Sequence, residues 1–221
     1  TGTDNLALHA ASLVSKQQGA AIRLEKNLPS SAGIGGGSSD AAATVRALCA
    51  LWQSPEPDLQ SLASLGSDVP VCMSAQLTRM RGVGETLDLL GEPPELAFVL
   101  INPRVEVSTQ RVFTALERKS NSAIGQDMPD PSDLDAWLLW LSFQRNDLEQ
   151  PACNLAPVIV DVLDALNLLP EARLVRMSGS GATCFSIMED RQSAKAAAKD
   201  LQLAHPSWWV KDAATCFANF R

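Results

Sequence analysis

The stretch Leu-Pro-Ser-Ser-Ala-Gly-Ile-Gly-Gly-Gly-Ser-Ser-Asp-Ala-Ala, residues 28–42, places four glycines within five positions, directly before two serines and an alanine-rich segment. Glycine has no Cβ, so these residues can adopt positive φ and leave their backbone N–H groups open to an oxyanion. A helix that begins near Ser39 or Asp40 would direct the positive end of its dipole toward the same anion. The pattern predicts a phosphate-binding loop, and its natural ligand is a nucleotide polyphosphate.

The spacing of this loop excludes two common phosphate-binding motifs. A Walker A loop requires Gly, four residues and then Gly-Lys-Ser/Thr, and no lysine lies between Lys26 and the end of the following helix. A dinucleotide fingerprint beginning at Gly33 would need its third glycine at position 38, where the chain has Ser38. The alternative of a flexible Gly/Ser linker is disfavoured, because the loop lies between an alternating segment at 20–25 and a strongly periodic helix.

The segment from Pro29 to Ala42 resembles the central ATP-binding motif of the GHMP kinases. Two further segments agree: residues 65–71 are similar to the substrate-side segment of that family, and residues 178–185 to its C-terminal glycine motif. The triple glycine followed by Ser-Ser-Asp is most similar to the branch that phosphorylates the 2-hydroxyl of 4-diphosphocytidyl-2-C-methyl-D-erythritol. The resemblance extends from about Asp4 to the last strand, and therefore covers nearly the whole chain.

The resemblance implies an α+β, two-domain GHMP kinase fold. An incomplete ATP-binding domain of the ribosomal protein S5 domain 2-like type is expected over residues 1–92, and a ferredoxin-like domain over residues 93–221. The implied activity is that of an ATP- and Mg²⁺-dependent kinase of the non-mevalonate isoprenoid precursor pathway. The family's first motif, with a lysine and a Tyr-His segment, should precede Thr1, so we expect an N-terminally truncated chain. Two alternatives stay open: another GHMP small-molecule kinase acting on homoserine, mevalonate or a sugar, and an inactive nucleotide-binding fragment.

The nucleotide site is expected around the glycine loop. Phosphoryl transfer requires the phosphates to be held, the developing charge to be neutralised and the acceptor hydroxyl to be oriented. Backbone amides of residues 35–39 would hold the phosphates, and the Ser39 hydroxyl is the expected Mg²⁺ ligand, with ordinary helix N-capping by the two serines as the alternative. The resemblance implies that Asn5, Leu6 and Lys26 lie around the adenine of ATP. The expected ATP-binding residues are Asn5, Leu6, Lys26, Pro29, Ala32, Gly33, Ile34, Gly35, Gly36, Gly37, Ser38 and Ser39.

Asp68 is the expected catalytic carboxylate and also an expected substrate contact. It lies between Gly-Ser and Val-Pro, an otherwise apolar setting in which a lone carboxylate is costly. The resemblance makes it the base, or the orienting group, for the substrate hydroxyl; a helix cap or turn former is the alternative. Thr109, Ser180 and Gly181 are also expected to contact the substrate, although Ser-Gly-Ser-Gly between strands is often a simple hairpin turn.

Composition limits the partners of the chain. Its 221 residues carry a net charge of −7 and a pI near 4.8, which argues against nucleic acid or an anionic membrane as a partner. No apolar stretch approaches the ~20 residues that span a bilayer. We expect a cytoplasmic enzyme with a small-molecule substrate, as a monomer or weak homodimer. Five well-separated cysteines and two histidines indicate reduced core thiols rather than a zinc site.

Periodicity and turn signals predict the secondary structure. Asp4 is expected to cap the first helix, the segment Gly91–Pro94 to separate two domains, and Trp208 and Trp209 to pack on a sheet. Residues 120–131 are expected to form a surface loop. Helices are expected over residues 5–17, about 40–53, 58–65, 108–118, 132–142, 157–168 and 191–203. Strands are expected over residues 20–25, within 82–90, over 98–101, on both sides of a turn within 173–188, and over 208–217.

Overall fold

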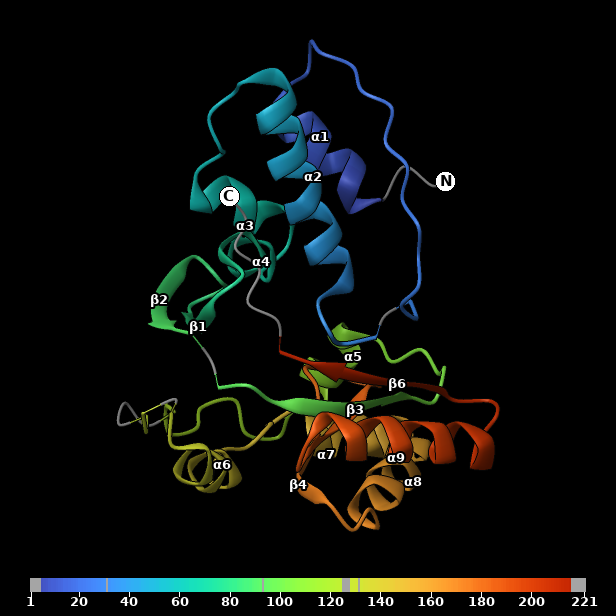
Figure 1. Ribbon diagram of the computed structural model, residues 1–221. Coiled ribbons are helices and arrows are strands. Elements are labelled where there is room, and N and C mark those ends of the chain that lie inside the picture. Colours follow the sequence, from blue (N-terminus) through green and yellow to red (C-terminus); the bar gives the residue numbers. More distant parts are fainter. Residues whose placement is uncertain (1–4, 31, 93, 125–127, 131, 216–221) are drawn as a thin grey trace. The chain divides into compact units, whose positions relative to one another are not determined.

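The computed structural model describes residues 5–30, 32–92, 94–124, 128–130 and 132–215. They form two compact units, shown in Figure 1. Of the described residues, unit 1 contains 5–27 and 35–92, and unit 2 contains 28–30, 32–34 and 94–215. The chain therefore passes from unit 2 to unit 1 between Ile34 and Gly35, inside the glycine loop.

Unit 1 is built on helices. Its elements are α1 (Leu6–Val14), α2 (Gly36–Trp52), α3 (Leu59–Leu65), α4 (Val69–Ser74) and a hairpin of two antiparallel strands, β1 (Leu77–Arg81) and β2 (Thr86–Gly91). Helices α1 and α2 pack against each other through Ala10, Ala41 and Ala42, all fully buried. Small side chains at this contact let the two helix axes approach closely, because the interaxial distance depends on the residues between them.

The boundaries of α1 and α2 differ from the expected ones. The expected cap Asp4 lies outside the described residues, and the cap observed is Asn5, whose side-chain oxygen accepts a hydrogen bond from the Ala7 N–H at 2.9 Å. Helix α1 ends at Val14 rather than near residue 17. Helix α2 begins three residues earlier than Ser39, because Gly35 adopts a left-handed conformation with φ 67° and serves as its N-cap. Only glycine takes this conformation at little cost.

The strand expected over residues 20–25 is wrong. The described residues 16–27 belong to no helix or strand, and most of their side chains are exposed, including Ile22 at 38%. Alternation of apolar and polar residues predicts a strand only where a neighbouring strand supplies hydrogen bonds. The two strands described in unit 1 pair with each other instead.

The region after Asp68 holds an element that sequence patterns did not predict. Helix α4 is only six residues long and contains Pro70 in its first turn, where proline is tolerated because the N–H would have no helical partner. The strand expected within residues 82–90 is partly right. Residues 82–85 form the turn of the hairpin, and β2 begins at Thr86.

Unit 2 is built on a four-stranded antiparallel sheet with strand order β4-β5-β3-β6. Strand β3 (Ala97–Asn102) lies inside the sheet, with Val99 opposite Ser186 of β5 (Cys184–Met188) and opposite Asp212 of β6 (Trp209–Ala214). Strand β4 (Ala172–Met177) pairs with the other side of β5. The uninterrupted apolar run at 98–101 predicted a strand buried on both faces. The strand is confirmed, with Val99 and Ile101 fully buried, but Phe98 and Leu100 on its other face are only half-buried.

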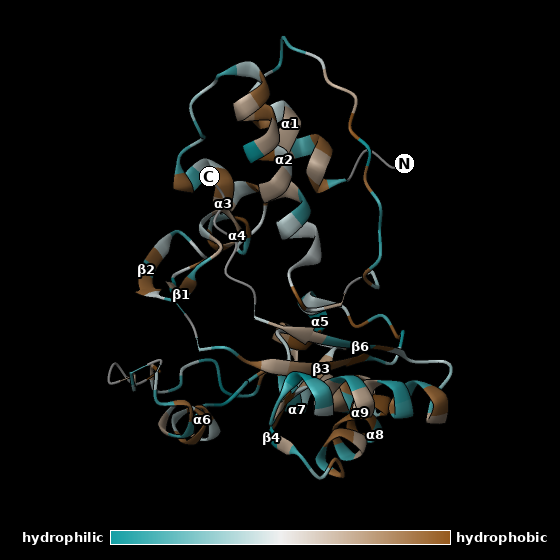
Figure 2. Cartoon of the chain, viewed as in Figure 1, coloured by the Kyte–Doolittle hydropathy of each residue, from teal (hydrophilic) through white to brown (hydrophobic). Residues whose placement is uncertain are grey.

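The helices of unit 2 complete its core, and several of them pack directly on the sheet. The helices are α5 (Thr109–Thr114), α6 (Leu134–Ser142), α7 (Glu149–Leu155), α8 (Val158–Asn167) and α9 (Arg191–Ala204). Helix α8 contacts β4 and β5, and α9 contacts β3, β5 and β6. Figure 2 shows the mixed polar and apolar surface of α9, whose buried positions recur at helical spacing: Ala194, Ala198 and Leu201.

Most expectations for unit 2 are confirmed. The helices expected over 108–118, 132–142, 157–168 and 191–203 correspond to α5, α6, α8 and α9, and the last strand to β6. Trp208 and Trp209 are buried, as expected of residues that pack on the sheet. Helix α7 was not predicted. Residues 216 and 217 of the expected last strand lie outside the described residues, and the described parts of 120–131 form no helix or strand.

Both units mix helices with antiparallel strands, so the expected α+β class is confirmed. Within the described ranges, no helix has the length and hydropathy that would let it cross a membrane. Cys49, Cys153 and Cys184 are buried and unpaired, as expected of reduced core cysteines, and burial raises the pKa of each thiol.

Candidate active site

The start of helix α2 presents a row of backbone N–H groups. The first four N–H groups of an α-helix lack a partner within the helix. Here they belong to residues 35–38, and none of the four makes a hydrogen bond to another described residue. The Ser39 N–H is already donated to the Gly35 carbonyl at 2.8 Å, so the expectation that this fifth amide is free for phosphate is wrong. Four such amides at the positive end of a 17-residue helix have the chemistry that binds an anion.

The serines of the loop do not cap the helix. Gly35 occupies the N-cap position and makes no side-chain cap bond, while Ser38 and Ser39 lie inside the first turns of α2. The alternative interpretation of these serines as N-caps is therefore wrong. The Ser39 hydroxyl is exposed and lies 3.5 Å from the Cys72 sulfur.

Asp68 lies beside the glycine loop within unit 1. A Cβ built on Gly35 would be 3.8 Å from Oδ2 of Asp68, which places this carboxylate next to the first of the free amides. Asp68 precedes α4, but its side chain makes no capping hydrogen bond to that helix. Its Oδ1 accepts a hydrogen bond from the Ser67 hydroxyl at 3.3 Å. A carboxylate that does not cap its own helix remains available to a ligand.

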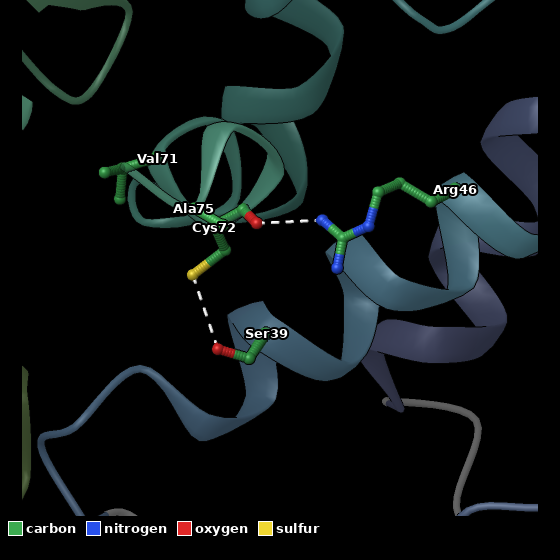
Figure 3. A pocket seen from close by; sticks show the side chains of 5 residues that line it. All are labelled: Ser39, Arg46, Val71, Cys72 and Ala75. Carbon is green, nitrogen blue, oxygen red and sulfur yellow. Dashed lines mark hydrogen bonds between the residues drawn. The ribbon is translucent and has the colours of Figure 1, made fainter. Parts of the chain in front are cut away.

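A pocket of about 390 Å³ lies between the start of α2 and helix α4. Figure 3 shows the side chains that line it: Ser39, Arg46, Val71, Cys72 and Ala75. Arg46 donates a hydrogen bond to the Cys72 carbonyl at 2.9 Å and thereby satisfies the carboxyl-terminal end of α4. Burial raises the pKa of the Cys72 thiol, and the nearby charge of Asp68 adds to that increase. The thiol is therefore protonated at neutral pH and supplies no anionic ligand to the pocket.

The residues expected around the adenine all lie in unit 1. Leu6 is placed beside the loop, since a Cβ on Gly37 would be 3.4 Å from its Cδ1. Lys26 forms an ion pair with Asp40, in the second turn of α2. The side-chain oxygen of Asn5 is used to cap α1. The structure thus brings Leu6 and Lys26 to the first turns of α2, while Asn5 has the structural role of a cap.

The first part of the glycine loop packs against the second glycine motif inside unit 2. A Cβ on Gly33 would lie 2.5 Å from the Gly181 carbonyl oxygen, and a Cβ on Gly179 would lie 2.9 Å from the Gly33 oxygen. The Ser178 hydroxyl donates to the Gly33 carbonyl at 2.8 Å, and the Thr183 N–H donates to the Ala32 carbonyl at 3.3 Å. Two motifs separated by about 145 positions therefore meet backbone to backbone, with no room for side chains.

The expected substrate residues of unit 2 are also close together. Thr109, the first residue of α5, shares a hydrogen bond of 2.8 Å with the hydroxyl of Ser180, and Gly181 follows in the same turn. The side chain of Ser108 accepts from the Arg111 N–H and caps α5, which fixes Thr109 at the start of the helix. Pro29 and Ile34 belong to the loop segment of unit 2, and both are half-buried.

Sequence reasoning missed one close contact in unit 1. Gly84, at the tip of the β1–β2 hairpin, has φ 102°, and a Cβ there would lie 2.1 Å from the Ser67 carbonyl oxygen. The backbone at the hairpin tip is therefore in close contact with Ser67, the residue before Asp68. The sequence signal was present as Gly-Val-Gly at 82–84, but nothing local shows which distant carbonyl such a turn will meet.

Comparisons with known proteins agree with this geometry. The family model described as GHMP kinases N terminal domain matches residues 5–76, and the model described as GHMP kinases C terminal matches residues 112–206. A 4-diphosphocytidyl-2-C-methyl-D-erythritol kinase of Cereibacter sphaeroides strain ATCC 17025 is 48% identical over 211 residues, which are 95% of this chain and 76% of that protein. The enzyme of the same name from Ruegeria pomeroyi is 49% identical over 208 residues, 93% of this chain and 74% of its own.

The solved structures that are similar to this chain include two kinases. A crystal structure of 4-(cytidine 5'-diphospho)-2C-methyl-D-erythritol kinase matches with a TM-score of 0.78 and 34% identity, over 98% of this chain and 80% of that one. A homoserine kinase from Cytophaga hutchinsonii matches with a TM-score of 0.59 and 18% identity, over 86% of this chain and 68% of that one. The second likeness shows the shared fold alone. From its two matched domains and its identity to these relatives, the chain belongs to the GHMP kinase family.

Proposed function

We propose that this chain is an ATP-dependent kinase that phosphorylates the 2-hydroxyl of 4-diphosphocytidyl-2-C-methyl-D-erythritol, a step toward isoprenoid precursors. The observation that carries the proposal is that the amides of residues 35–38 donate to no other described residue and that the Asp68 carboxylate lies beside Gly35. The choice of substrate rests on relatives of that name at 48% and 49% identity.

Phosphoryl transfer depends mainly on positioning and charge stabilisation. The amides at the start of α2 would hold the negatively charged β- and γ-phosphates without any lysine in the loop, because each N–H points toward the anion and the helix dipole adds to the attraction. Asp68 would accept the proton of the substrate hydroxyl, or orient that hydroxyl toward the γ-phosphorus. Asp68 makes no capping bond to α4, and the hydrogen bond from Ser67 goes to Oδ1, so Oδ2 can take this role.

The residues present fit a magnesium ion that is held mostly by nucleotide phosphates. Mg²⁺ prefers oxygen ligands and binds through one or two protein groups together with phosphates and water. The exposed hydroxyl of Ser39 is an oxygen donor at the start of α2, and we propose that it holds the ion. The bound ion would neutralise charge on the phosphates.

The remaining assignments are part of the same proposal. Leu6 would contact the adenine, with Asn5 and Lys26 close to it. Thr109, Ser180 and Gly181 would contact the second substrate. We propose an ATP-binding domain over residues 1–92, a C-terminal domain over 93–221, a cytoplasmic location, and a monomer or weak homodimer.

A substrate panel tests the proposal. The chain is incubated with [γ-³²P]ATP, Mg²⁺ and, separately, 4-diphosphocytidyl-2-C-methyl-D-erythritol, homoserine and mevalonate. We expect label only on the cytidylyl substrate, and its loss in Asp68→Asn. Label on homoserine or mevalonate instead would overturn the choice of substrate. Binding of a fluorescent ATP analogue without transfer to any acceptor would favour an inactive nucleotide-binding chain.

A further inference from the structure

The second glycine motif is held by Asn146, which lies in the segment just before helix α7. Within the turn, the Gly181 N–H donates to the Ser178 carbonyl at 2.9 Å, and the Ser178 N–H donates to the Thr183 carbonyl at 2.9 Å. The carbonyl groups of Met177 and Gly179 take no part in these bonds. Both of them accept from one side chain, that of Asn146, at 3.0 and 2.8 Å.

The orientation of the Asn146 amide is fixed by its own neighbours. Its side-chain oxygen accepts from the Leu148 N–H at 3.0 Å, and its backbone carbonyl accepts from the Glu149 N–H at 3.1 Å. A flipped amide would place its oxygen against two carbonyl oxygens and its NH₂ group against an N–H, so the network determines the orientation. Glu149 adds a third bond, since its Oε2 accepts from the Met177 N–H at 2.9 Å.

The turn that Asn146 holds is the surface on which Gly33 rests. Gly33 packs against the carbonyl oxygens of Ser178 and Gly181 too closely for any side chain, and its own carbonyl accepts from the Ser178 hydroxyl. A contact between two backbones has no flexible side chain to absorb a displacement. If the 177–181 turn moves, Gly33 must move with it, because close-packed groups transmit strain.

We infer that Asn146 is a positioning residue for the nucleotide loop: through its two hydrogen bonds to the Met177 and Gly179 carbonyls, it fixes the glycine turn that sets the position of Gly33. This inference rests on the proposed ATP-binding role of the loop. The side-chain hydrogen bonds of Asn146 go to the turn and to Leu148, and none goes to a described residue of the loop, so its effect passes through the turn.

An isosteric change tests the inference. Asn146→Asp keeps the oxygen that accepts from Leu148 and removes both N–H donors. Asn154→Asp makes the same change at an exposed position of α7, where the side-chain oxygen accepts a hydrogen bond from Gln150. In chain labelled with ¹⁵N-glycine, we expect the assigned amide signals of Gly33, Gly179 and Gly181 to shift in Asn146→Asp and to stay in place in Asn154→Asp. Unmoved signals in Asn146→Asp would overturn the inference.

Nucleotide affinity gives a second readout that a merely stabilising residue would not change. By isothermal titration we expect the Kd for Mg-ATP to rise about tenfold in Asn146→Asp, the size of one to two weakened hydrogen bonds, and to stay unchanged in Asn154→Asp. Wild-type affinity in a folded Asn146→Asp chain would contradict the inference. Should this variant unfold, Asn146→Ala, which removes the donors without adding charge, decides by the same two measurements.

Failure of the proposed function gives a different pattern. If the wild-type chain binds no Mg-ATP, the proposed function is wrong. The amide signals of Gly33, Gly179 and Gly181 in Asn146→Asp would still show whether Asn146 positions Gly33.

Discussion

Unit 1 and unit 2 owe their cohesion to different kinds of residue. The core of unit 2 contains large, fully buried aliphatic side chains on a four-stranded sheet, such as Ile101, Ile159 and Leu166. The core of unit 1 has alanines at the contact between α1 and α2, with Val45 among its larger members. Because apolar stabilisation grows with buried area, these large aliphatic side chains contribute more per residue than the alanines between α1 and α2. Unit 1 instead carries the free amides of α2 and the Asp68 carboxylate.

The contrast suggests a division of labour. Unit 2 supplies a rigid support, on which Gly33 and the Ser178–Gly181 turn meet backbone to backbone. Unit 1 contains the groups that we propose for phosphate binding and catalysis, the amides at the start of α2 and the Asp68 carboxylate, which makes no capping bond to α4. If this division holds, substitutions in the two units should affect stability and activity separately.

The largest expected effect is on activity and belongs to unit 1. Asp68→Asn should lower kcat roughly 1,000-fold, the scale of a lost general base. The urea midpoint should stay near that of the wild type, because the carboxylate makes no capping bond to α4. Steady-state kinetics and urea denaturation measure the two quantities, and Asp88→Asn, at an exposed ion pair with Arg81, is the matched control. A variant that keeps its activity and loses its stability would make Asp68 a structural residue.

Core truncation compares the two units directly. Ile159→Ala should cost about 4 kcal/mol of unfolding free energy and Val45→Ala about 2.5 kcal/mol, because the first removes more buried carbon and leaves a larger cavity. Both side chains are fully buried, so exposure does not account for the difference. Urea denaturation followed by circular dichroism measures each cost. An equal or greater cost at Val45 would remove the contrast between the two cores.

The glycine contact in unit 2 should be intolerant of a methyl group. Gly33→Ala is expected to cost about 2 kcal/mol, because its Cβ would meet two carbonyl oxygens at 2.5 and 2.8 Å and φ is +71°. Gly19→Ala, where nothing lies within 4 Å, should change stability by less than about 0.5 kcal/mol. The melting temperatures of the two variants, compared with that of the wild type, measure the two costs. Equal melting temperatures would show that the two glycine motifs are not closely packed.

The smallest effect concerns two helix caps, one in each unit. Asp58 caps α3 and Asp190 caps α9, and the N–H groups of Ser61 and Ser193 hold the pKa of these carboxyls below the usual range. A lowered folded-state pKa means that the stabilisation is complete above the unfolded value, near pH 4, and is lost as the pH falls through the folded value.

Replacing both carboxylates by asparagine removes this titration but keeps a good capping residue. The wild type should therefore lose more stability between pH 4 and pH 2 than Asp58→Asn/Asp190→Asn, as measured by urea denaturation at each pH. Parallel pH profiles for the two proteins would contradict the assigned origin of the shifts.

Local patterns predicted those parts of the molecule that depend on local chemistry. The run at 98–101 predicted β3, Asp58 stands before α3, and the glycines at 33–37 predicted a bend before a helix. The alternation at 20–25 failed, since a strand depends on a partner that sequence spacing does not reveal. Helices α4 and α7 escaped prediction because each is short and has a proline near its start.

The site shows the same limit. The resemblance of three motifs identified the family, yet local sequence could not reveal that Gly84 meets Ser67 or that Asn146 bonds Met177 and Gly179. These contacts join residues that are 17 to 33 positions apart, and they depend on how whole elements pack. The sequence also could not show how many loop amides are free. In the structure α2 begins early enough that the Ser39 N–H already donates to the Gly35 carbonyl.

The amides at the start of α2 offer the most direct test of the account. In chain labelled with ¹⁵N-glycine, addition of Mg-ATP should shift the amide signals of Gly35, Gly36 and Gly37 and leave those of Gly19 and Gly91, where a Cβ would meet nothing within 4 Å, in place. Saturable binding of Mg-ATP with these three signals unmoved would contradict the central claim, because the triphosphate would then be held elsewhere.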